Sequence, residues 1–258
     1  MQSNPIWFPT IIGEVASAAL FFRPYPRPMQ IDLVELPQHL GEGHRAGRVI
    51  LVIDVLRATT TIAAALHAGA NQVRVFADID EARTAAEQDD ALLAGERNCR
   101  PIDGFDFGNS PGDLATSRVR GRNLCMTTTN GTAAILAAEG AASVFTLGLV
   151  NLSATCRHVH DLGRDVTILC AGTDGRATEE DTLVAYIAKS VLRQTSDVAQ
   201  LPVTHAELME AFLRSRGGKN LLAAGYVLDV DVAARLDLYP TVCEARGDVV
   251  HCVVDSGQ

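Results

Sequence analysis

Residues 49–66, VILVIDVLRATTTIAAAL, contain the pattern that decides the fold of this chain. A run of β-branched and aliphatic residues, typical of a buried strand, stops at Asp54. A polar turn with Arg57, Thr59 and Thr60 follows, and an alanine-rich helix begins directly after it. The free N–H groups and the positive dipole end at the start of a helix favour an anion such as phosphate. We therefore expect an anion-binding site at the end of this strand.

The same strand–loop–helix pattern occurs twice more. Residues 124–138, LCMTTTNGTAAILAA, contain a hydroxyl-rich loop, and residues 166–188 contain a glycine-containing loop before an acidic helix start. Short strands follow the first two helices, so we interpret these units as βαβ with right-handed crossovers. The predicted fold class is α/β, with three α/β/α layers and a mostly parallel, mixed sheet. Sites in such sheets form beyond the carboxyl ends of the strands, where the three loops would converge on one ligand.

The loop at residues 127–132, TTTNGT, has four threonines, one asparagine and one glycine in six positions. A single threonine would be enough to cap the following helix. A loop of hydroxyls and backbone N–H groups that wraps around an oxyanion explains the surplus. We therefore expect this loop to bind an anion.

The composition is that of an ordinary globular protein with an acidic balance. The chain has 258 residues, is 47% hydrophobic and carries a formal net charge of -9. No basic run indicates a nucleic-acid partner, and no stretch reaches the roughly 18 apolar residues of a membrane span. The six cysteines form no C-x-x-C pair and show no zinc spacing. Because the chain is too long and too rich in apolar residues to be a disulfide scaffold, we expect a reducing cytoplasm. An acidic protein can still bind an anion if an arginine lies nearby or a divalent cation bridges the two, which points to a metal as one possibility.

Domain boundaries are marked by a proline-rich segment, RPYPRPMQ, at residues 23–30. We interpret residues 1–28 as an N-terminal extension or linker and residues 29–258 as one domain, with a possible C-terminal subdomain from about residue 200. The apolar segment at 6–22 lacks the basic start of a signal peptide. Near the C-terminus, an amphipathic helix is expected over 204–216, with a second short helix after Lys219 and a hairpin over 241–254.

Several acidic side chains allow a structural and a functional interpretation. Asp54 is either a helix cap or ion-pair partner of Arg57, or a metal ligand or general base. Glu96 and Asp106 stand in comparable loop positions. The run Glu179–Asp181 is either a dipole-favoured first helical turn or a source of ligands for Mg²⁺, which prefers carboxylate oxygens. These alternatives stay open at the level of the residues.

Cys170 stands at the end of the strand that opens the segment 166–188, and five residues separate it from Arg176. This arrangement resembles the loop of cysteine phosphatases, in which a thiolate attacks phosphorus and an arginine holds the phosphate oxygens. Leu169 stands where that motif usually has histidine. The alternative is a buried, inert cysteine.

Taken together, six motifs resemble the 2-phosphosulfolactate phosphatase family. They match its order and approximate spacing, and the resemblance covers about residues 29–239, with a looser match towards the C-terminus. The motifs are VIDVLRATTTI at 52–62, LLAGE at 92–96, GFDFGNSP at 104–111, TTTNGT at 127–132, CAGT at 170–173 and ED at 180–181.

The resemblance implies a three-layer hydrolase that uses Mg²⁺ to cleave the phosphate monoester of (2R)-2-phospho-3-sulfolactate, giving 3-sulfolactate and phosphate, in coenzyme M biosynthesis. The expected partner is therefore a small anionic phosphorylated substrate, and a homo-oligomer is compatible with the sequence. The first rival is a metal-free phosphatase with Cys170 as nucleophile. The second is a protein that binds a phosphorylated or sulfonated acid without turnover.

The candidate site residues follow from these motifs. The candidate catalytic residues are Asp54, Arg57 and Cys170, and the candidate metal ligands are Glu96, Asp106, Glu180 and Asp181, with Asp54 as a further acidic candidate. The candidate substrate-binding residues are Thr59, Thr60, Asn109, Ser110, Thr128, Thr129, Asn130, Gly131, Thr132, Gly172 and Thr173.

Overall fold

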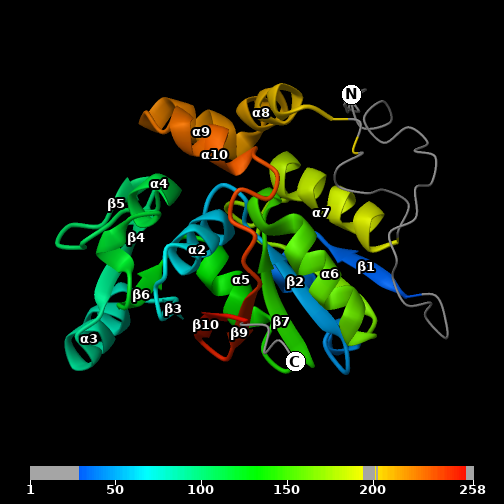
Figure 1. The fold of residues 1–258 in the computed structure, drawn as a ribbon, viewed down its shortest axis with the longest axis horizontal. Helices are drawn as coiled ribbons and strands as arrows, with labels where there is room; N and C mark the ends of the chain where they lie inside the picture. Colours follow the sequence, from blue (N-terminus) through cyan, green and yellow to red (C-terminus); the bar gives the residue numbers. More distant parts are fainter. Residues whose placement is uncertain (1–28, 194–200, 202, 254–258) are drawn as a thin grey trace.

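The computed structural model describes residues 29–193, 201 and 203–253, and these form an α/β fold on one ten-stranded sheet (Figure 1). The sheet is mixed and mostly parallel, as predicted, and helices flank it. The strands are β1 Ile31–Val34, β2 Val49–Ile53, β3 Gln72–Phe76, β4 Leu92–Arg97, β5 Arg100–Pro101, β6 Asn123–Thr127, β7 Ser143–Leu147, β8 Val166–Cys170, β9 Cys243–Arg246 and β10 Val249–Cys252.

The α-helices of the described residues separate these strands or follow them. They are α2 Ala58–His67, α3 Ile79–Asp89, α4 Pro111–Leu114, α5 Gly131–Ala137, α6 Leu152–Leu162, α7 Glu179–Leu192, α8 His205–Arg214, α9 Arg216–Ala224 and α10 Val227–Ala233. Short 3-10 turns lie at Pro37–His39, Glu42–His44, Ser117–Val119 and Leu149–Asn151. None of the helices in the described ranges has the length and apolar character needed to cross a membrane.

The strand order is β1-β8-β2-β7-β9-β10-β3-β6-β4-β5. Strands β1, β8, β2 and β7 pair in parallel, and so do β3, β6 and β4. The C-terminal hairpin β9–β10, which the sequence predicts, lies between these two groups and is antiparallel to its neighbour on each side. The predicted βαβ units are therefore wrong in one respect. Helices α2 and α5 each connect strands on opposite sides of the hairpin, and three successive antiparallel pairings separate the strands that each helix joins, so these strands do not belong to one parallel group.

Strand β2 shows why the sheet is covered on both faces. Its residues alternate between two cores: Val49, Leu51 and Ile53 belong to the core under α6 and α7, whereas Ile50 and Val52 belong to the core under α2 and α5. A strand buried on both faces needs an uninterrupted apolar sequence, and VILVI provides it. The three predicted layers are thereby explained.

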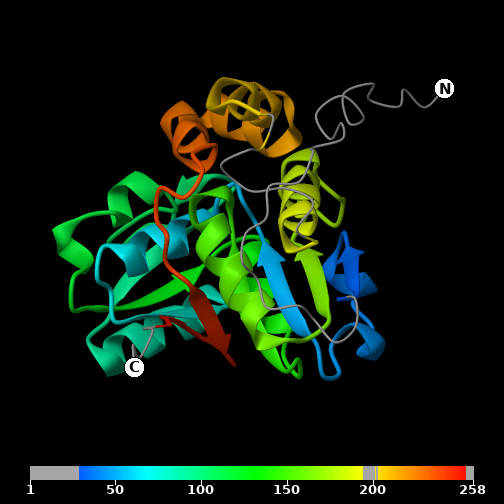
Figure 2. The same cartoon turned by 45° about the vertical axis from the view of Figure 1, so that its right-hand side comes forward.

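Helices α8, α9 and α10 lie together on one side of the sheet, and Figure 2 shows them in orange above β2 and β8. The predicted capping box of α8 is present, because the Glu207 N–H donates to the Thr204 hydroxyl at 3.3 Å and the Thr204 N–H donates to the Glu207 carboxylate at 2.8 Å. Helix α9 begins at Arg216, earlier than the predicted start after Lys219. Helix α10 was not anticipated by the sequence analysis. The apolar segment 6–22 lies outside the described residues.

Candidate active site

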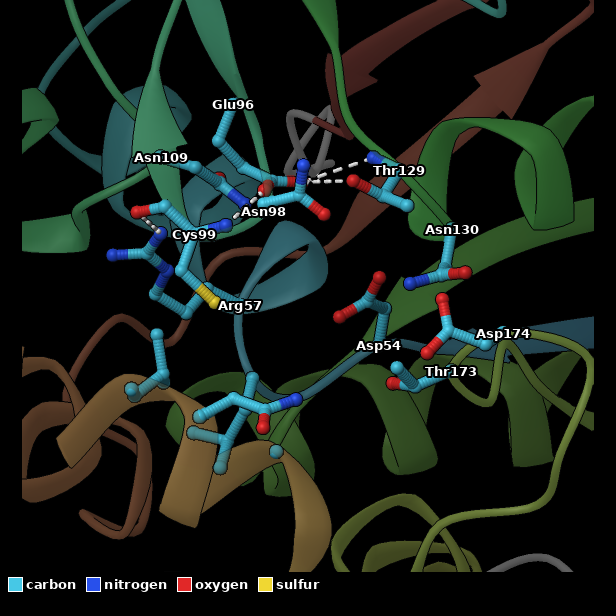
Figure 3. A pocket seen from close by; sticks show the side chains of 14 residues that line it. Asp54, Arg57, Glu96, Asn98, Cys99, Asn109, Thr129, Asn130, Thr173 and Asp174 are labelled. Carbon is cyan, nitrogen blue, oxygen red and sulfur yellow. Dashed lines mark hydrogen bonds between the residues drawn. The ribbon is translucent and has the colours of Figure 1, made fainter. Parts of the chain in front are cut away.

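A cavity lies where the loops after β2, β4, β6 and β8 meet helix α9 (Figure 3). The convergence of the strand ends therefore agrees with the expectation from sequence. Seven of the predicted site residues line it: Asp54, Arg57, Glu96, Asn109, Thr129, Asn130 and Thr173. Seven further lining residues were not anticipated: Leu56, Asn98, Cys99, Asp174, Gly217, Asn220 and Leu221.

Asp54 follows the last residue of β2, and its carboxylate faces the middle of the cavity (Figure 3). The Ala58 N–H, at the start of α2, donates to Asp54 Oδ1 at 3.3 Å. The positive end of α2, which we expected to receive the substrate's anion, is thus already capped by a carboxylate of the protein. Burial raises the pKa of Asp54 to about 7, and the nearby charges of Glu96 and Glu180 add to the rise.

Glu96, near the end of β4, is held by three hydrogen bonds. Its Oε1 accepts from the Thr129 N–H and the Thr129 hydroxyl, each at 2.9 Å, and its Oε2 accepts from the Cys99 N–H at 2.7 Å. The carboxylate therefore joins the loop after β6 to the turn after β4. Because it also lines the cavity, Glu96 remains available as a ligand while fixing the shape of the wall.

Glu180 and Asp181, in the first turn of α7, are both buried and have different partners. The two oxygens of Asp181 accept from the Val55 N–H at 2.9 Å and the Gly172 N–H at 3.2 Å, so Asp181 clamps two loops together. One oxygen of Glu180 accepts from the Gly217 N–H at 3.1 Å, and the other has no hydrogen-bond partner among the described residues. Burial raises the pKa of both carboxyls. Glu180 therefore has an oxygen to offer to a cation, whereas Asp181 is committed to the backbone.

Arg57 lines the cavity but is already paired. Its Nη1 donates to Asp229 Oδ2 at 2.5 Å, its Nη2 donates to the Cys99 carbonyl at 3.2 Å, and its guanidinium carbon lies 4.5 Å from the centre of the Tyr226 ring. The second oxygen of Asp229 accepts from the Ser110 hydroxyl at 2.7 Å. The predicted substrate-binding residue Ser110 is thereby committed to Asp229 and does not line the cavity.

Most of the predicted substrate-binding threonines face the protein interior, which corrects their assignment. The Thr59 hydroxyl lies 2.8 Å from the Leu147 carbonyl, and the Thr60 hydroxyl donates to the Val55 carbonyl at 2.8 Å. Thr128 and Thr132 exchange hydrogen bonds across the start of α5. These four side chains are buried because their hydroxyls satisfy backbone groups of tightly packed loops.

The glycines of the predicted set lie beside the cavity without lining it. A Cβ atom at Gly131 would lie 2.5 Å from Asp54 Oδ2, so Gly131 permits the close approach of two loops. Gly172 has a φ of +66° and packs against Leu36 and the backbone of Arg176. Both glycines are required by backbone packing rather than by direct contact with the cavity.

Cys170 is fully buried, and the structure contradicts its assignment as a nucleophile. Its side chain belongs to the core under α6 and α7, where burial raises the thiol pKa well above its ordinary value. Arg176, the arginine of the cysteine-phosphatase pattern, is exposed to solvent. The thiol that does line the cavity is the half-buried Cys99, for which no sequence motif provided a signal.

Asp106 is likewise separated from the site. Its carboxylate is exposed and accepts the Leu93 N–H at 2.8 Å, which makes it a cap for the edge of β4. We therefore remove Asp106 from the candidate metal ligands.

The remaining carboxylates suit a cation that needs few protein ligands. Within the described ranges, no three His, Cys, Asp or Glu side chains converge so as to enclose a metal ion. Mg²⁺, however, is commonly held by one or two carboxylates, with water and substrate phosphate completing its shell. Asp54 lines the cavity, whereas Glu180 does not line it and is buried beside the lining residue Gly217. The Asp54 carboxylate and the unpartnered oxygen of Glu180 are the groups available for this role, and their mutual repulsion would be relieved by a positive charge.

The fold and the cavity define the class of this protein: an α/β protein with an acidic cavity at the carboxyl ends of its parallel strands. Comparison with known proteins gives the family. Residues 34–248 match the model of 2-phosphosulpholactate phosphatase. The chain belongs to this family, which confirms the resemblance seen in the motifs.

Relatives from three bacteria agree with this match, and each is named probable 2-phosphosulfolactate phosphatase. The protein from Deinococcus radiodurans is 41% identical over 209 residues, covering 75% of this chain and 87% of the relative. The protein from Caldanaerobacter subterraneus is 31% identical over 219 residues, covering 80% and 91%. The protein from Carboxydothermus hydrogenoformans is 32% identical over 239 residues, covering 89% and 99%.

Proposed function

We propose that this protein is a Mg²⁺-dependent phosphatase that hydrolyses (2R)-2-phospho-3-sulfolactate to 3-sulfolactate and phosphate. The observation that carries the proposal is the Asp54 carboxylate, which faces the cavity at the end of β2 in a chain of this family. Carboxylates without partner cations are ill suited to binding an anion alone, and they are useful once a metal ion is present.

Asp54 and Glu180 are the residues that would hold Mg²⁺, with Glu96 as a further oxygen donor. When bound, the metal would supply positive charge to the phosphate and leaving-group oxygens. Asp54 would be ionised in the loaded protein, because a nearby cation favours the charged form of a carboxyl. The Ala58 N–H holds the carboxylate of Asp54 in place for that role.

The neutral polar wall of the cavity would bind and orient the substrate. Asn109 is buried, lines the cavity, and has an amide oxygen without a hydrogen-bond partner among the described residues. Thr129 and Asn130 line the same cavity after β6. Arg57 adds positive charge to the wall, and its pairing with Asp229 keeps the guanidinium in one orientation.

We further place the activity in a reducing cytoplasm. All six cysteines are free thiols in the structure, and none is bridged to another. A chain of this length and apolar content does not need a disulfide scaffold, which supports a compartment in which disulfides do not persist.

The direct test is incubation of the purified protein with racemic 2-phospho-3-sulfolactate and Mg²⁺, with phosphate measured and 3-sulfolactate identified by NMR. We expect up to half of the racemate to be consumed, because the proposal is specific for one enantiomer. The binding-protein alternative predicts saturable heat of binding in calorimetry and no phosphate release. Binding without release would therefore overturn the proposed function.

A further inference from the structure

The first turns of α7 and α9 are joined by two neighbouring hydrogen bonds. The Arg216 N–H donates to Glu179 Oε2 at 3.1 Å, and the Gly217 N–H donates to Glu180 Oε1 at 3.1 Å. Two consecutive glutamates thus accept hydrogen bonds from two consecutive backbone N–H groups of α9. The N–H groups of a first helical turn lack partners within their own helix, so these carboxylates cap α9 from a neighbouring helix.

The two glutamates differ in their surroundings. Glu179 is exposed, whereas Glu180 is 3% exposed and its Oε2 has no hydrogen-bond partner in the described part of the chain. A buried carboxylate oxygen without a partner is costly unless a proton or a cation compensates it. The free oxygen of Glu180 is therefore suited to hold a cation beside α9.

Helix α9 in turn forms one wall of the cavity. Gly217, Asn220 and Leu221 line it, and their spacing of three and four residues places them on one face of the helix. Gly217 leaves no room for a side chain, because a Cβ atom there would overlap Glu180 Oε1. The close contact of Gly217 with Glu180 therefore determines the position of α9 at the edge of the cavity.

We propose that Glu180 couples binding of the divalent cation to the packing of α9 at the wall of the cavity. Its Oε1 holds the Gly217 N–H, and its Oε2 binds the cation. This inference rests on the proposed function for the presence of the cation. One carboxylate makes both contacts. Cation binding therefore stabilises the packed position of α9, and the packed position of α9 in turn favours cation binding.

The test compares two isosteric variants of adjacent residues, Glu180→Gln and Glu179→Gln. Both keep an oxygen that can accept from α9, and only the first removes a charge from the buried position. Hydrogen exchange of the 216–218 segment is followed with and without Mg²⁺, and Mg²⁺ affinity is measured by calorimetry in the absence of substrate. Circular dichroism and thermal unfolding show that each variant is folded.

We expect Mg²⁺ to slow exchange of the 216–218 segment several-fold in the wild type and in Glu179→Gln. In Glu180→Gln we expect this effect to disappear and Mg²⁺ affinity to fall about 10-fold or more, as for loss of a charged metal partner. Wild-type Mg²⁺ affinity in Glu180→Gln would overturn the coupling. So would a Mg²⁺-stimulated phosphatase in which the metal leaves exchange of this segment unchanged. A protein that shows the Mg²⁺ effect on exchange but releases no phosphate would refute the proposed function and leave the coupling intact.

Discussion

Gly131, the first residue of α5, packs against the carboxylate of Asp54 so closely that a Cβ atom at position 131 would lie 2.5 Å from Asp54 Oδ2. The same atom would lie 2.4 Å from the Cβ of Ala58. Real Cβ atoms do not approach other atoms this closely, so the backbone or the carboxylate would have to move. The glycine of the TTTNGT loop is thus explained by the space that Asp54 occupies.

Replacing Gly131 with Ala should therefore displace Asp54. We expect kcat/KM for phosphate release to fall at least 10-fold and the free energy of unfolding to fall by about 1–3 kcal/mol, as for other overpacked sites. The matched control is Gly43→Ala, because nothing lies within 4 Å of a Cβ atom at that position. Equal activity in the two variants would show that the contact between Gly131 and Asp54 has no role in catalysis.

The raised pKa of Asp54 predicts a pH dependence of stability in the metal-free protein. The pKa rises from 3.8 to about 7 in the folded state. Between these values the unfolded chain has lost a proton that the folded protein still holds, so increasing the pH through this window destabilises the fold. The effect for one group approaches about 1.4 kcal/mol per pH unit.

This dependence is measured by thermal unfolding in EDTA from pH 4 to pH 8, with Asp54→Asn as the comparison. The variant lacks the titrating group, so its unfolding temperature should rise relative to the wild type as the pH increases. A constant difference between the two proteins across this range would show that Asp54 titrates as an ordinary exposed carboxyl.

Cys170→Ala should retain phosphatase activity within a few-fold of the wild type. The thiol is buried in the core, and burial keeps its pKa far above neutral pH, so no thiolate is available to attack phosphorus. The cost to stability should be roughly 1 kcal/mol, as for removal of a small buried group. Complete loss of activity in a folded Cys170→Ala protein would restore the cysteine-phosphatase mechanism.

The buried pair of Arg57 and Asp229 predicts a large cost when one partner is removed. Asp229→Ala leaves a buried guanidinium without its carboxylate and should lower the free energy of unfolding in urea by about 3–5 kcal/mol. Asp231 lies on the same helix as Asp229, but its carboxylate is 26% exposed and pairs with the half-exposed Arg235 and with His205. Asp231→Ala should therefore cost less than about 1 kcal/mol. Similar losses in both variants would show that the Arg57 pair does not fix the cavity wall.

The strand–loop–helix pattern identified the sheet, the loops of the site and the approximate place of Asp54, because these features are local in sequence. The position of the hairpin β9–β10 could not be predicted in this way. Its neighbours β7 and β3 are about 100 and 175 residues away, and their pairing depends on long-range contacts.

The orientation of individual side chains could also not be predicted from the sequence. Thr59 and Thr129 belong to similar threonine-rich loops, yet Thr59 bonds to backbone carbonyls inside the protein and Thr129 lines the cavity. The sequence left Cys170 open as a nucleophile or a buried, inert cysteine, and the helices that cover β8 bury it. No sequence motif predicted that α9 lines the cavity, because its position depends on the contact between Gly217 and Glu180.

The most direct test of the central claim is the rate of phosphate release from 2-phospho-3-sulfolactate in saturating Mg²⁺ by the wild type and by Asp54→Asn. If Asp54 holds the metal at the end of β2, the wild type is active, excess EDTA abolishes its activity, and the folded variant loses at least about 1000-fold in kcat, a barrier increase of roughly 4 kcal/mol. Near-normal turnover by Asp54→Asn, or full wild-type activity in EDTA, would contradict the account.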